Sequence, residues 1–223
     1  KKTIYNTNYS ADIRLEAVSL SQFSSTNQGF RIAGNQKDKE EADYLVNKFK
    51  EIGLSNVEKV PVNMDGWELG EISFKFACDC AEIGYQNFHS IGVYPSNFSF
   101  ENSNFDTLNI GSLISNPNVD VTNKGVILSS DKNLKEEVEL AKEKCAAFVV
   151  YPYISELYST SYTIDITKGI PTDIPVFAFS KSNYDLLLDE VALNENIVVT
   201  LSGYSKLKEN TTSDFIIGEI EGT

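Results

Sequence analysis

The stretch Lys124–Pro152, KGVILSSDKNLKEEVELAKEKCAAFVVYP, predicts a strand, a helix and a second strand. The apolar run VIL near its start is bounded by Gly125 and by two serines, which is typical of a short buried strand. The run Ala146–Tyr151, AAFVVY, is rich in β-branched and aromatic residues and ends at Pro152, which cannot donate to a sheet. The connection SSDKN lacks a glycine-rich phosphate turn, so a nucleotide-binding fold is not indicated.

We expect the intervening helix to be capped by Asn133 together with Glu136, three residues later. Its apolar positions recur at helical spacing and predict a buried stripe: Leu134, Val138, Ala141 and Cys145. Cys145 is therefore expected to pack as a small hydrophobic residue. The charged positions predict a solvated face: Glu136, Glu137, Glu139, Lys142, Glu143 and Lys144.

Composition limits the classes of partner. The 223 residues carry a formal net charge of −13, which argues against a nucleic-acid partner because such partners require a cationic surface. No apolar run of about 18 residues is present, so the sequence predicts no membrane span. The first ten residues, KKTIYNTNYS, lack an apolar segment, which predicts that a secretory signal is absent or removed.

Before the opening stretch, the pattern predicts two helices. The first covers Ala11–Phe23 with Ser10 as its cap, and the second follows the cap Asn35 and ends at Gly53. Two strands, Val57–Asn63 and Leu69–Ala77, are then expected to form a hairpin around a turn at Asp65 and Gly66, with Pro61 restricting the first strand to an edge or a bulge.

The rest of the sequence predicts some secondary-structure elements clearly and others weakly. Cys78–Thr107 lacks clear periodicity and predicts a long connection, and SKLKENTTS, residues 205–213, predicts a polar linker. The other expected elements are a weak strand at Leu108–Ile114, a buried strand at Ile174–Phe179, a helix capped by Ser180, and strands at Asn196–Ser202 and Asp214–Ile220.

Several residues are candidates for a site. Cys78, Cys80 and His89 suggest a thiolate and imidazole metal site, but a tetrahedral site needs four ligands and the spacing fits no finger pattern, so the residues indicate no metal site. Arg31 and Gly34 have two interpretations. Either both border a substrate cleft, or Arg31 forms a structural pair and Gly34 forms the turn before the second helix, and the second interpretation is favoured.

The aromatic candidates also have two interpretations. Trp67 either contacts a peptide or covers the apolar face of the expected hairpin, and we favour the second. A tyrosine group either forms a recognition surface or is partly buried, and partial burial is favoured: Tyr151, Tyr153, Tyr158 and Tyr162.

The order of these elements resembles two known families. The runs at Lys124–Leu128, Ala141–Ala146, Ala147–Tyr151 and Ile174–Ser180 are similar to a protease-associated domain. Gly29–Gly34, GFRIAG, with the helix and strand after it, and Asp214–Thr223, DFIIGEIEGT, resemble the start and the return strand of the M28 family of zinc aminopeptidases, where Asn usually replaces Asp214.

The M28 resemblance implies two zinc ions held by His, Asp and Glu ligands that follow the strand after EIEGT, beyond the residues present here. No catalytic or metal-binding residue is therefore transferred to this chain, and no substrate-binding residue is assigned. His89 is the only histidine and matches no ligand position, so we expect the chain alone to be inactive and to hold no cofactor.

We therefore expect a mixed α/β chain. Residues 1 to about 80 and 211–223 would supply two helices and about three strands of an incomplete peptidase domain, and residues 81–210 an inserted β-rich protease-associated domain with two helices. The leading hypothesis is the non-catalytic N-terminal portion of a secreted or cell-surface zinc aminopeptidase, whose inserted domain shapes substrate access. Its partners would be a peptide substrate or the missing catalytic half.

The alternative hypothesis is a stand-alone protease-associated module that binds peptides or proteins without peptidase activity. The first hypothesis predicts an exposed apolar face on the strands at Val57–Ala77 and Asp214–Ile220, since a catalytic half would normally cover it. The alternative predicts a soluble monomer without such a face. A different hydrolase class has little support because the chain lacks Gly-x-Ser-x-Gly.

Overall fold

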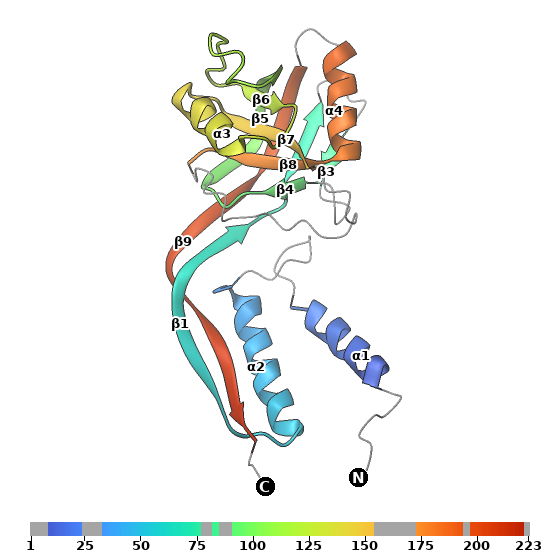
Figure 1. Cartoon of the computed structure of the whole chain (residues 1–223), viewed down its shortest axis with the longest axis vertical. Coiled ribbons are helices and arrows are strands. Elements are labelled where there is room, and N and C mark those ends of the chain that lie inside the picture. The colour runs from blue at the N-terminus through green and yellow to red at the C-terminus, as the bar shows by residue number, and fades with distance from the viewer. Residues whose placement is uncertain are drawn as a thin grey trace. The chain divides into compact units, whose positions relative to one another are not determined.

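A computed structural model describes residues 9–23, 33–76, 82–84, 91–153, 173–193 and 197–220. These residues fall into two compact units (Figure 1). The terminal unit comprises residues 1–68 and 208–223, and the inserted unit comprises residues 69–207. Helices and a mixed sheet are both present, which confirms the mixed α/β prediction.

The inserted unit is built on a sheet of strand order β3-β2-β9-β5-β6-β7-β8-β4. The strands outside the opening stretch are β2 (Ser73–Phe76), β3 (Glu82–Gly84), β4 (Ile91–Val93), β5 (Phe98–Gly111), β8 (Val176–Ser180) and the first part of β9 (Ile197–Glu219). The helix α4 (Lys181–Leu193) follows β8.

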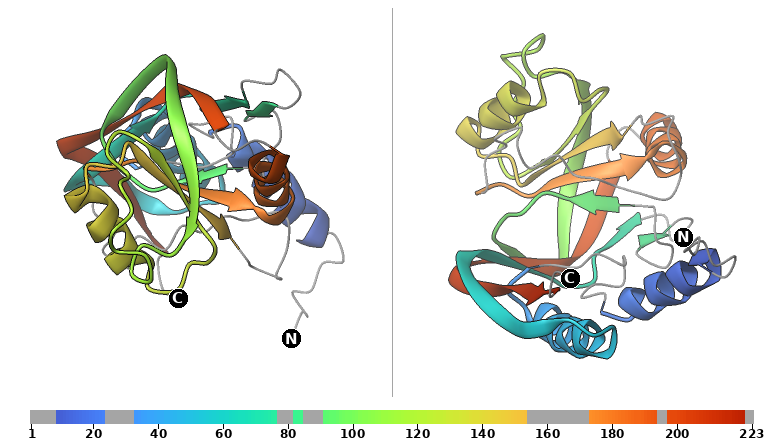
Figure 2. Two further views of the ribbon diagram at one scale, coloured as in Figure 1. Left: turned by 90° about the horizontal axis from the view of Figure 1, so that it is seen from above. Right: turned by 60° about the horizontal axis from the view of Figure 1, so that its bottom comes forward.

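The predicted strand–helix–strand unit is confirmed as β6 (Gly125–Leu128), α3 (Leu134–Glu143) and β7 (Phe148–Tyr153). Strands β6 and β7 are parallel, and β5 and β8 extend this parallel group on either side. Helices α3 and α4 lie on opposite sides of these strands in both views of Figure 2. Parallel strands covered in this way are buried on both faces, which explains their continuous apolar runs.

The two faces of the parallel strands differ in chemistry. Alternate residues such as Val149 and Val176 join the aliphatic core, which also includes Leu134 and Val138 of α3. The intervening residues face an aromatic cluster that is joined by edge-to-face ring contacts: Phe74, Phe98, Phe100, Phe105, Phe148, Phe177 and Phe179.

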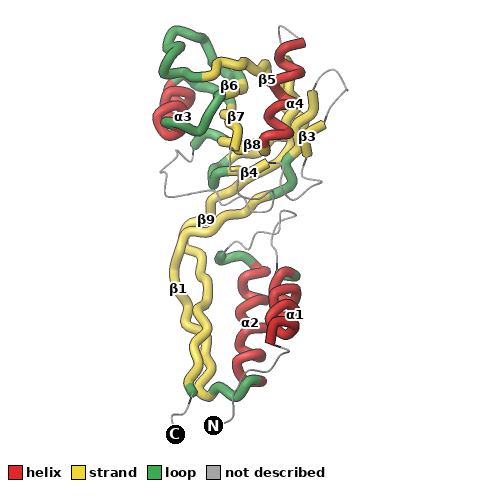
Figure 3. The backbone as a smooth tube through the Cα atoms, turned by 45° about the vertical axis from the view of Figure 1, so that its right-hand side comes forward, coloured by secondary structure: helices red, strands yellow, loops and turns green. Residues whose placement is uncertain are grey.

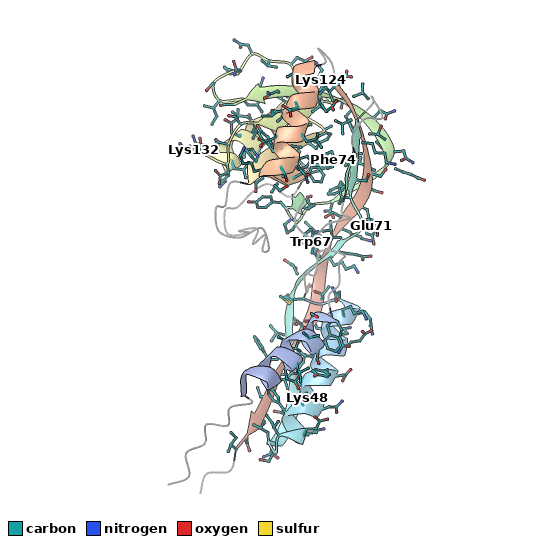
Figure 4. All side chains as sticks on the ribbon, turned by 90° about the vertical axis from the view of Figure 1, so that its right-hand side faces the viewer. Lys48, Trp67, Glu71, Phe74, Lys124 and Lys132 are labelled. Atoms are coloured by element: carbon teal, nitrogen blue, oxygen red, sulfur yellow. The ribbon has the colours of Figure 1, made fainter. Side chains whose placement is uncertain are left out.

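Phe74 closes this aromatic cluster. It lies on β2, near one end of the strand order, yet its ring centroid is 4.9 Å from that of Phe177 and 5.1 Å from that of Phe179 on β8, near the other end. Its side chain is labelled in Figure 4 and is 2% exposed. The sheet of the inserted unit therefore curls strongly enough to bring its two ends together.

The ends of α3 differ from the sequence prediction. Asn133 has φ 55° and its side chain makes no cap hydrogen bond, because a capping residue needs an extended backbone. At the other end, Cys145 has φ 56° and is exposed, so it does not extend the apolar stripe as predicted. The amide of Cys145 donates to Lys142 and that of Ala146 to Ala141, which is a Schellman ending.

Glu137 of α3 was predicted to face solvent but is 4% exposed. Its carboxylate accepts hydrogen bonds from the Ser112 hydroxyl at 2.6 Å, from the Leu113 amide at 2.7 Å and from the Ile114 amide at 3.2 Å. These bonds satisfy amides of the turn after β5, and they replace the water that the carboxylate loses on burial.

Tyr184 fixes α4 in a similar way. Its hydroxyl donates to the carbonyl of Leu128, at the end of β6, at 2.8 Å, and the bond is buried. Ser180 approaches the predicted capping position, since its hydroxyl lies 3.4 Å from the amide of Asn183. Each helix of the inserted unit is thus attached to the sheet by a specific buried polar contact.

The terminal unit contains α1 (Tyr9–Ser21), α2 (Gln36–Glu51), β1 (Ser55–Leu69, of which Leu69 belongs to the inserted unit) and the last part of β9. The predicted cap of α2 is confirmed, because Asn35 accepts a hydrogen bond from the amide of Asp38. The predicted end is also confirmed, with Gly53 at φ 91°. The first helix begins at Tyr9, so Ser10 lies inside it and is not its cap.

Helices α1 and α2 are joined mainly by polar contacts. The Tyr44 hydroxyl donates to Glu16 at 2.7 Å, and the Lys48 ammonium, labelled in Figure 4, lies 3.3 Å from the same carboxylate. The hydrogen bond from Tyr44, aided by Lys48, holds the pKa of Glu16 below its ordinary value. Phe23 adds a ring contact with Tyr44. No helix among the described residues has the length and apolarity needed to cross a membrane.

Four predictions about the strands are wrong. Strand β1 continues through Asp65 and Gly66 without a turn, and it pairs with β9 instead of forming a hairpin with β2. The predicted linker at residues 205–213 lies within β9. The predicted connection at Cys78–Thr107 contains β3, β4 and most of β5. Residues 205–213 are largely polar, so they contain no apolar run that would predict a strand.

Replacing Glu137 with alanine should destabilise the inserted unit by about 2–3 kcal/mol, because the amides of Leu113 and Ile114 would lose a charged acceptor. Chemical denaturation measures the change. Glu139→Ala, on the exposed side of the same helix, is the matched control. An effect no larger than that of the control would contradict the role given to Glu137.

Tyr184 should make stability depend on pH in the alkaline range. Burial, with a smaller contribution from the charge of Asp185, raises the pKa of Tyr184 to about 12. Since this folded-state pKa exceeds the ordinary value, the contribution is complete below about pH 10 and is lost as the pH rises toward 12. Below about pH 10, the free energy of unfolding of the native chain should exceed that of Tyr184→Phe by about 1 kcal/mol from the hydrogen bond alone. Denaturation curves should show this difference shrinking as the pH rises toward 12. A stability difference that stays the same across this pH range would contradict the prediction.

Candidate functional site

The terminal unit carries a two-stranded ribbon made of β1 and the last part of β9 (Figure 3). The strands run antiparallel, as three contacts show. The Ser55 hydroxyl donates to the Glu219 carbonyl, the Thr211 hydroxyl donates to the Met64 carbonyl, and Lys208 pairs with Glu68. The ribbon therefore has two faces and two edges.

One face of the ribbon points toward α2. The Lys59 ammonium lies 2.6 Å from Asp43 of α2 and 4.0 Å from Asp214 of β9. Because side chains alternate along a strand, the residues between these positions point to the opposite face. We call this opposite side the outer face of the ribbon: Val60, Val62, Met64, Phe215 and Ile217.

Every residue of the outer face is exposed. Phe215 is 66% and Ile217 is 46% exposed, and the three residues of β1 are each 37% exposed. All but two of the exposed large hydrophobic side chains of the described residues belong to the terminal unit, the exceptions being Ile114 and Tyr204. Exposed apolar faces are typical of surfaces that contact another segment or another protein.

The terminal unit has few buried hydrophobic residues in the part that the structure describes. Phe23 and Ala42 are its only buried hydrophobic residues in the described part of the chain. Packing is close where the segment before α2 meets the ribbon. There the Thr211 side chain occupies the space that a Cβ of Gly34 or Gly66 would need. The predicted turn at Gly34 is present, with φ 79°.

The inserted unit has a shallow groove of about 480 Å³ that crosses paired strands β5 and β9. It is lined by Asn97, Phe98, Ser99, Tyr204, Ser205 and Lys206. The lining combines two aromatic residues, Phe98 and Tyr204, with polar side chains and with Lys206. The sequence gave no sign of this groove, since its walls come from segments more than a hundred residues apart and one of them was predicted as an irregular connection.

The structure separates the residues that were considered as a site from the sequence. Trp67 lies half-buried on β1 and is labelled in Figure 4. Tyr151 is 2% exposed and contacts the hydroxyl of Tyr94, so it belongs to the core and to no recognition surface. The other candidates lie outside the described residues or side chains: Arg31, Cys78, Cys80, His89, Tyr153, Tyr158 and Tyr162.

A zinc site would need several carboxylate, imidazole or thiolate ligands in one place. Within the described ranges, no three His, Cys, Asp or Glu side chains are grouped so that they could hold a metal ion. The residues that the structure describes therefore do not fit a zinc site, and we derive no chemistry through a metal.

Comparison with solved structures identifies similar folds. A peptidase M28 precursor from Shewanella amazonensis matches with a TM-score of 0.61 and 18% identity, over 92% of this chain and 49% of its own. BSAP, a zinc aminopeptidase from Bacillus subtilis, matches with a TM-score of 0.59 and 23% identity, over 91% of this chain and 46% of its own. No protein-family model and no curated protein matches the chain.

This chain therefore spans about half the length of the solved structures it matches. At these identities the similarity defines the fold. The chain has the fold of roughly half of an M28-type peptidase, in which both the terminal and the inserted unit take part because the match covers nearly all of its residues.

Proposed function

We propose that this chain is the N-terminal, non-catalytic portion of an M28-like zinc aminopeptidase. The observation that carries the proposal is the combination of the outer face with the half-length match. The terminal unit exposes an apolar face that none of its described residues covers. The similar structures contain about as much additional chain, which would provide that cover.

We assign the inserted unit the role of shaping substrate access. It is a protease-associated domain in this proposal, and the described residues of its aliphatic and aromatic cores all belong to this unit. A closed domain of this kind is a suitable wall for a cleft, because it keeps its shape whichever substrate is present. Peptides would be the substrates of the whole enzyme. Zinc would be held by its other portion, which corresponds to the half of the similar structures that this chain does not match.

A stand-alone module that binds peptides or proteins is the second candidate, and the groove at Tyr204 favours it. Such a module would have an apolar surface matched to its ligand in the inserted unit. Most of the exposed apolar side chains lie instead in the terminal unit, which supports the enzyme portion over the binding module.

The first prediction concerns the outer face. Residues 1–223 alone should bind a hydrophobic dye and associate at micromolar concentration in light scattering, because Phe215 and its neighbours are exposed. Phe215→Lys together with Val62→Lys should reduce both signals. Ile114→Lys removes an exposed apolar side chain of the inserted unit and is the control. An unmodified chain that is monomeric and binds no dye would favour the stand-alone module.

The second prediction concerns the whole protein. The gene is expected to continue beyond Thr223 and to encode a His-x-Asp sequence soon after a strand. The encoded protein should hydrolyse aminoacyl substrates in the presence of zinc, whereas residues 1–223 alone should not, with or without zinc. A stop codon directly after Thr223, or turnover by the isolated chain, would contradict the proposal.

A further inference from the structure

The shallow groove of the inserted unit lies on the side of strands β5 and β9 that faces away from the aromatic cluster. Ser99 opposes Tyr204 in this antiparallel pair, and one step further along, the Leu207 amide donates to the Asn97 carboxamide oxygen at 2.8 Å. Because side chains alternate along each strand, four exposed residues of the groove share this side. They are Asn97, Ser99, Tyr204 and Lys206.

The floor of the groove is fixed from the opposite side of the two strands. Phe98 stacks on Phe100 with ring centroids 5.4 Å apart and meets the Phe177 ring edge to face. The Ser205 hydroxyl donates to the Ser96 carbonyl at 2.5 Å, and this bond is buried. Both strands are therefore anchored in the core beneath the groove, which lowers the cost of ordering it around a ligand.

Tyr204 forms the aromatic wall of the groove. Its ring occupies the space that a Cβ of Gly70 would need, and the Gly70 amide donates to the Tyr204 carbonyl at 2.9 Å. Tyr204 nevertheless remains 42% exposed. A tyrosine that is held in place but accessible can provide contact area to a ligand at a low cost in conformational entropy.

The polar residues of the groove supply hydrogen-bond donors and no negative charge. Lys206 contributes an ammonium that forms no ion pair with a described residue, whereas Lys208, two residues further along β9, pairs with Glu68 at 2.6 Å. The carboxamide oxygen of Asn97 already accepts the Leu207 amide, so the NH2 group is the part left to donate to a ligand.

This donor set favours an anionic ligand. No acidic side chain is among the described residues that line the groove, although the chain as a whole carries a net charge of −13. The overall charge repels anions, so the affinity for one must come from the local donors. An ammonium and a carboxamide NH2 group match the two oxygens of a carboxylate.

The shape of the groove restricts the kind of carboxylate. Its volume of about 480 Å³ is in the range of small-ligand sites, but such sites enclose their ligand and this groove is shallow. A ligand that extends beyond the groove therefore suits it better than a small acid. Tyr204 and Lys206 lie two residues apart on one strand, about 7 Å. The last residue of a peptide carries a carboxylate and a side chain on one carbon atom, so it can reach both.

We propose that the groove binds the C-terminal residue of a peptide, with its carboxylate at Lys206 and Asn97 and an apolar or aromatic side chain on the ring of Tyr204. The inference does not depend on the proposed function, because all the groove residues belong to the inserted unit, which an enzyme portion and a stand-alone module would both contain. An aminopeptidase removes residues from the other end of a peptide, so a peptide held in this way keeps its cleavable end outside the groove.

Fluorescence anisotropy tests the proposal with residues 1–223 and a hexapeptide that is labelled at its N-terminus and ends in phenylalanine. The peptide with a free carboxylate should bind about fivefold more tightly than the same peptide with a C-terminal amide, as expected for one exposed ion pair. In Lys206→Gln this difference should disappear, because the ammonium that distinguishes the two peptides is gone. Lys132→Gln removes another exposed ammonium of the inserted unit and should preserve the difference.

A second pair of measurements examines the aromatic wall. Replacing the final phenylalanine of the peptide with glycine should weaken binding to the native chain about fivefold, and Tyr204→Ser should remove this preference. Circular dichroism checks that Tyr204→Ser remains folded, and Lys206→Gln, which alters an exposed side chain, tests the proposal without this concern.

Three results would overturn the proposal. The first is equal binding of the carboxylate and amide peptides to the native chain. The second is an effect of Lys132→Gln as large as that of Lys206→Gln. The third is displacement of the peptide by 3-phenylpropionate at the same concentration as by the unlabelled hexapeptide, because the ligand would then be a small aromatic acid and not a peptide end.

Discussion

The terminal unit depends on one constraint, which is that its described residues cover a single face of the ribbon. Lys59 and Asp43 attach α2 to that face, and Thr211 fits against Gly34 and Gly66 where α2 begins. Only Phe23 and Ala42 are buried among its described hydrophobic residues. Surface ion pairs contribute little to stability, so these contacts set the geometry of the unit more than its free energy of unfolding.

The inserted unit satisfies its core with its own residues. Its parallel strands are covered by aliphatic packing on one face and by aromatic packing on the other. Its helices are fixed by Glu137 and Tyr184, which bind backbone groups at the ends of β5 and β6. Local opening should therefore need much less free energy in the terminal unit than in the inserted unit.

The sequence predicted the elements whose signal is local. The strands and helix of Lys124–Tyr151, the cap Asn35 and the stop Gly53 each follow from neighbouring residues. Strand β9 was divided in the prediction because residues 205–213 are polar, and only its pairing with β1 makes that segment a strand. Glu137 was placed in solvent because its partners are amides of a distant turn.

The candidate surfaces show the same division between local and long-range information. The hypothesis of an enzyme portion predicted an exposed apolar face on the strands at Val57–Ala77 and Asp214–Ile220. The structure has such a face on the ribbon, whereas Ile72 and Phe74 of the first range are buried. The groove at Tyr204 was missed, because β5 and β9 meet there only after the chain has folded.

The terminal unit is the feature that any account of function must explain. A binding module would need only the inserted unit, which closes its own core and carries the groove. The ribbon would then add exposed apolar surface and two open edges, which favour aggregation. The outer face instead suits an enzyme portion, in which further chain of the same protein would cover Phe215 and its neighbours.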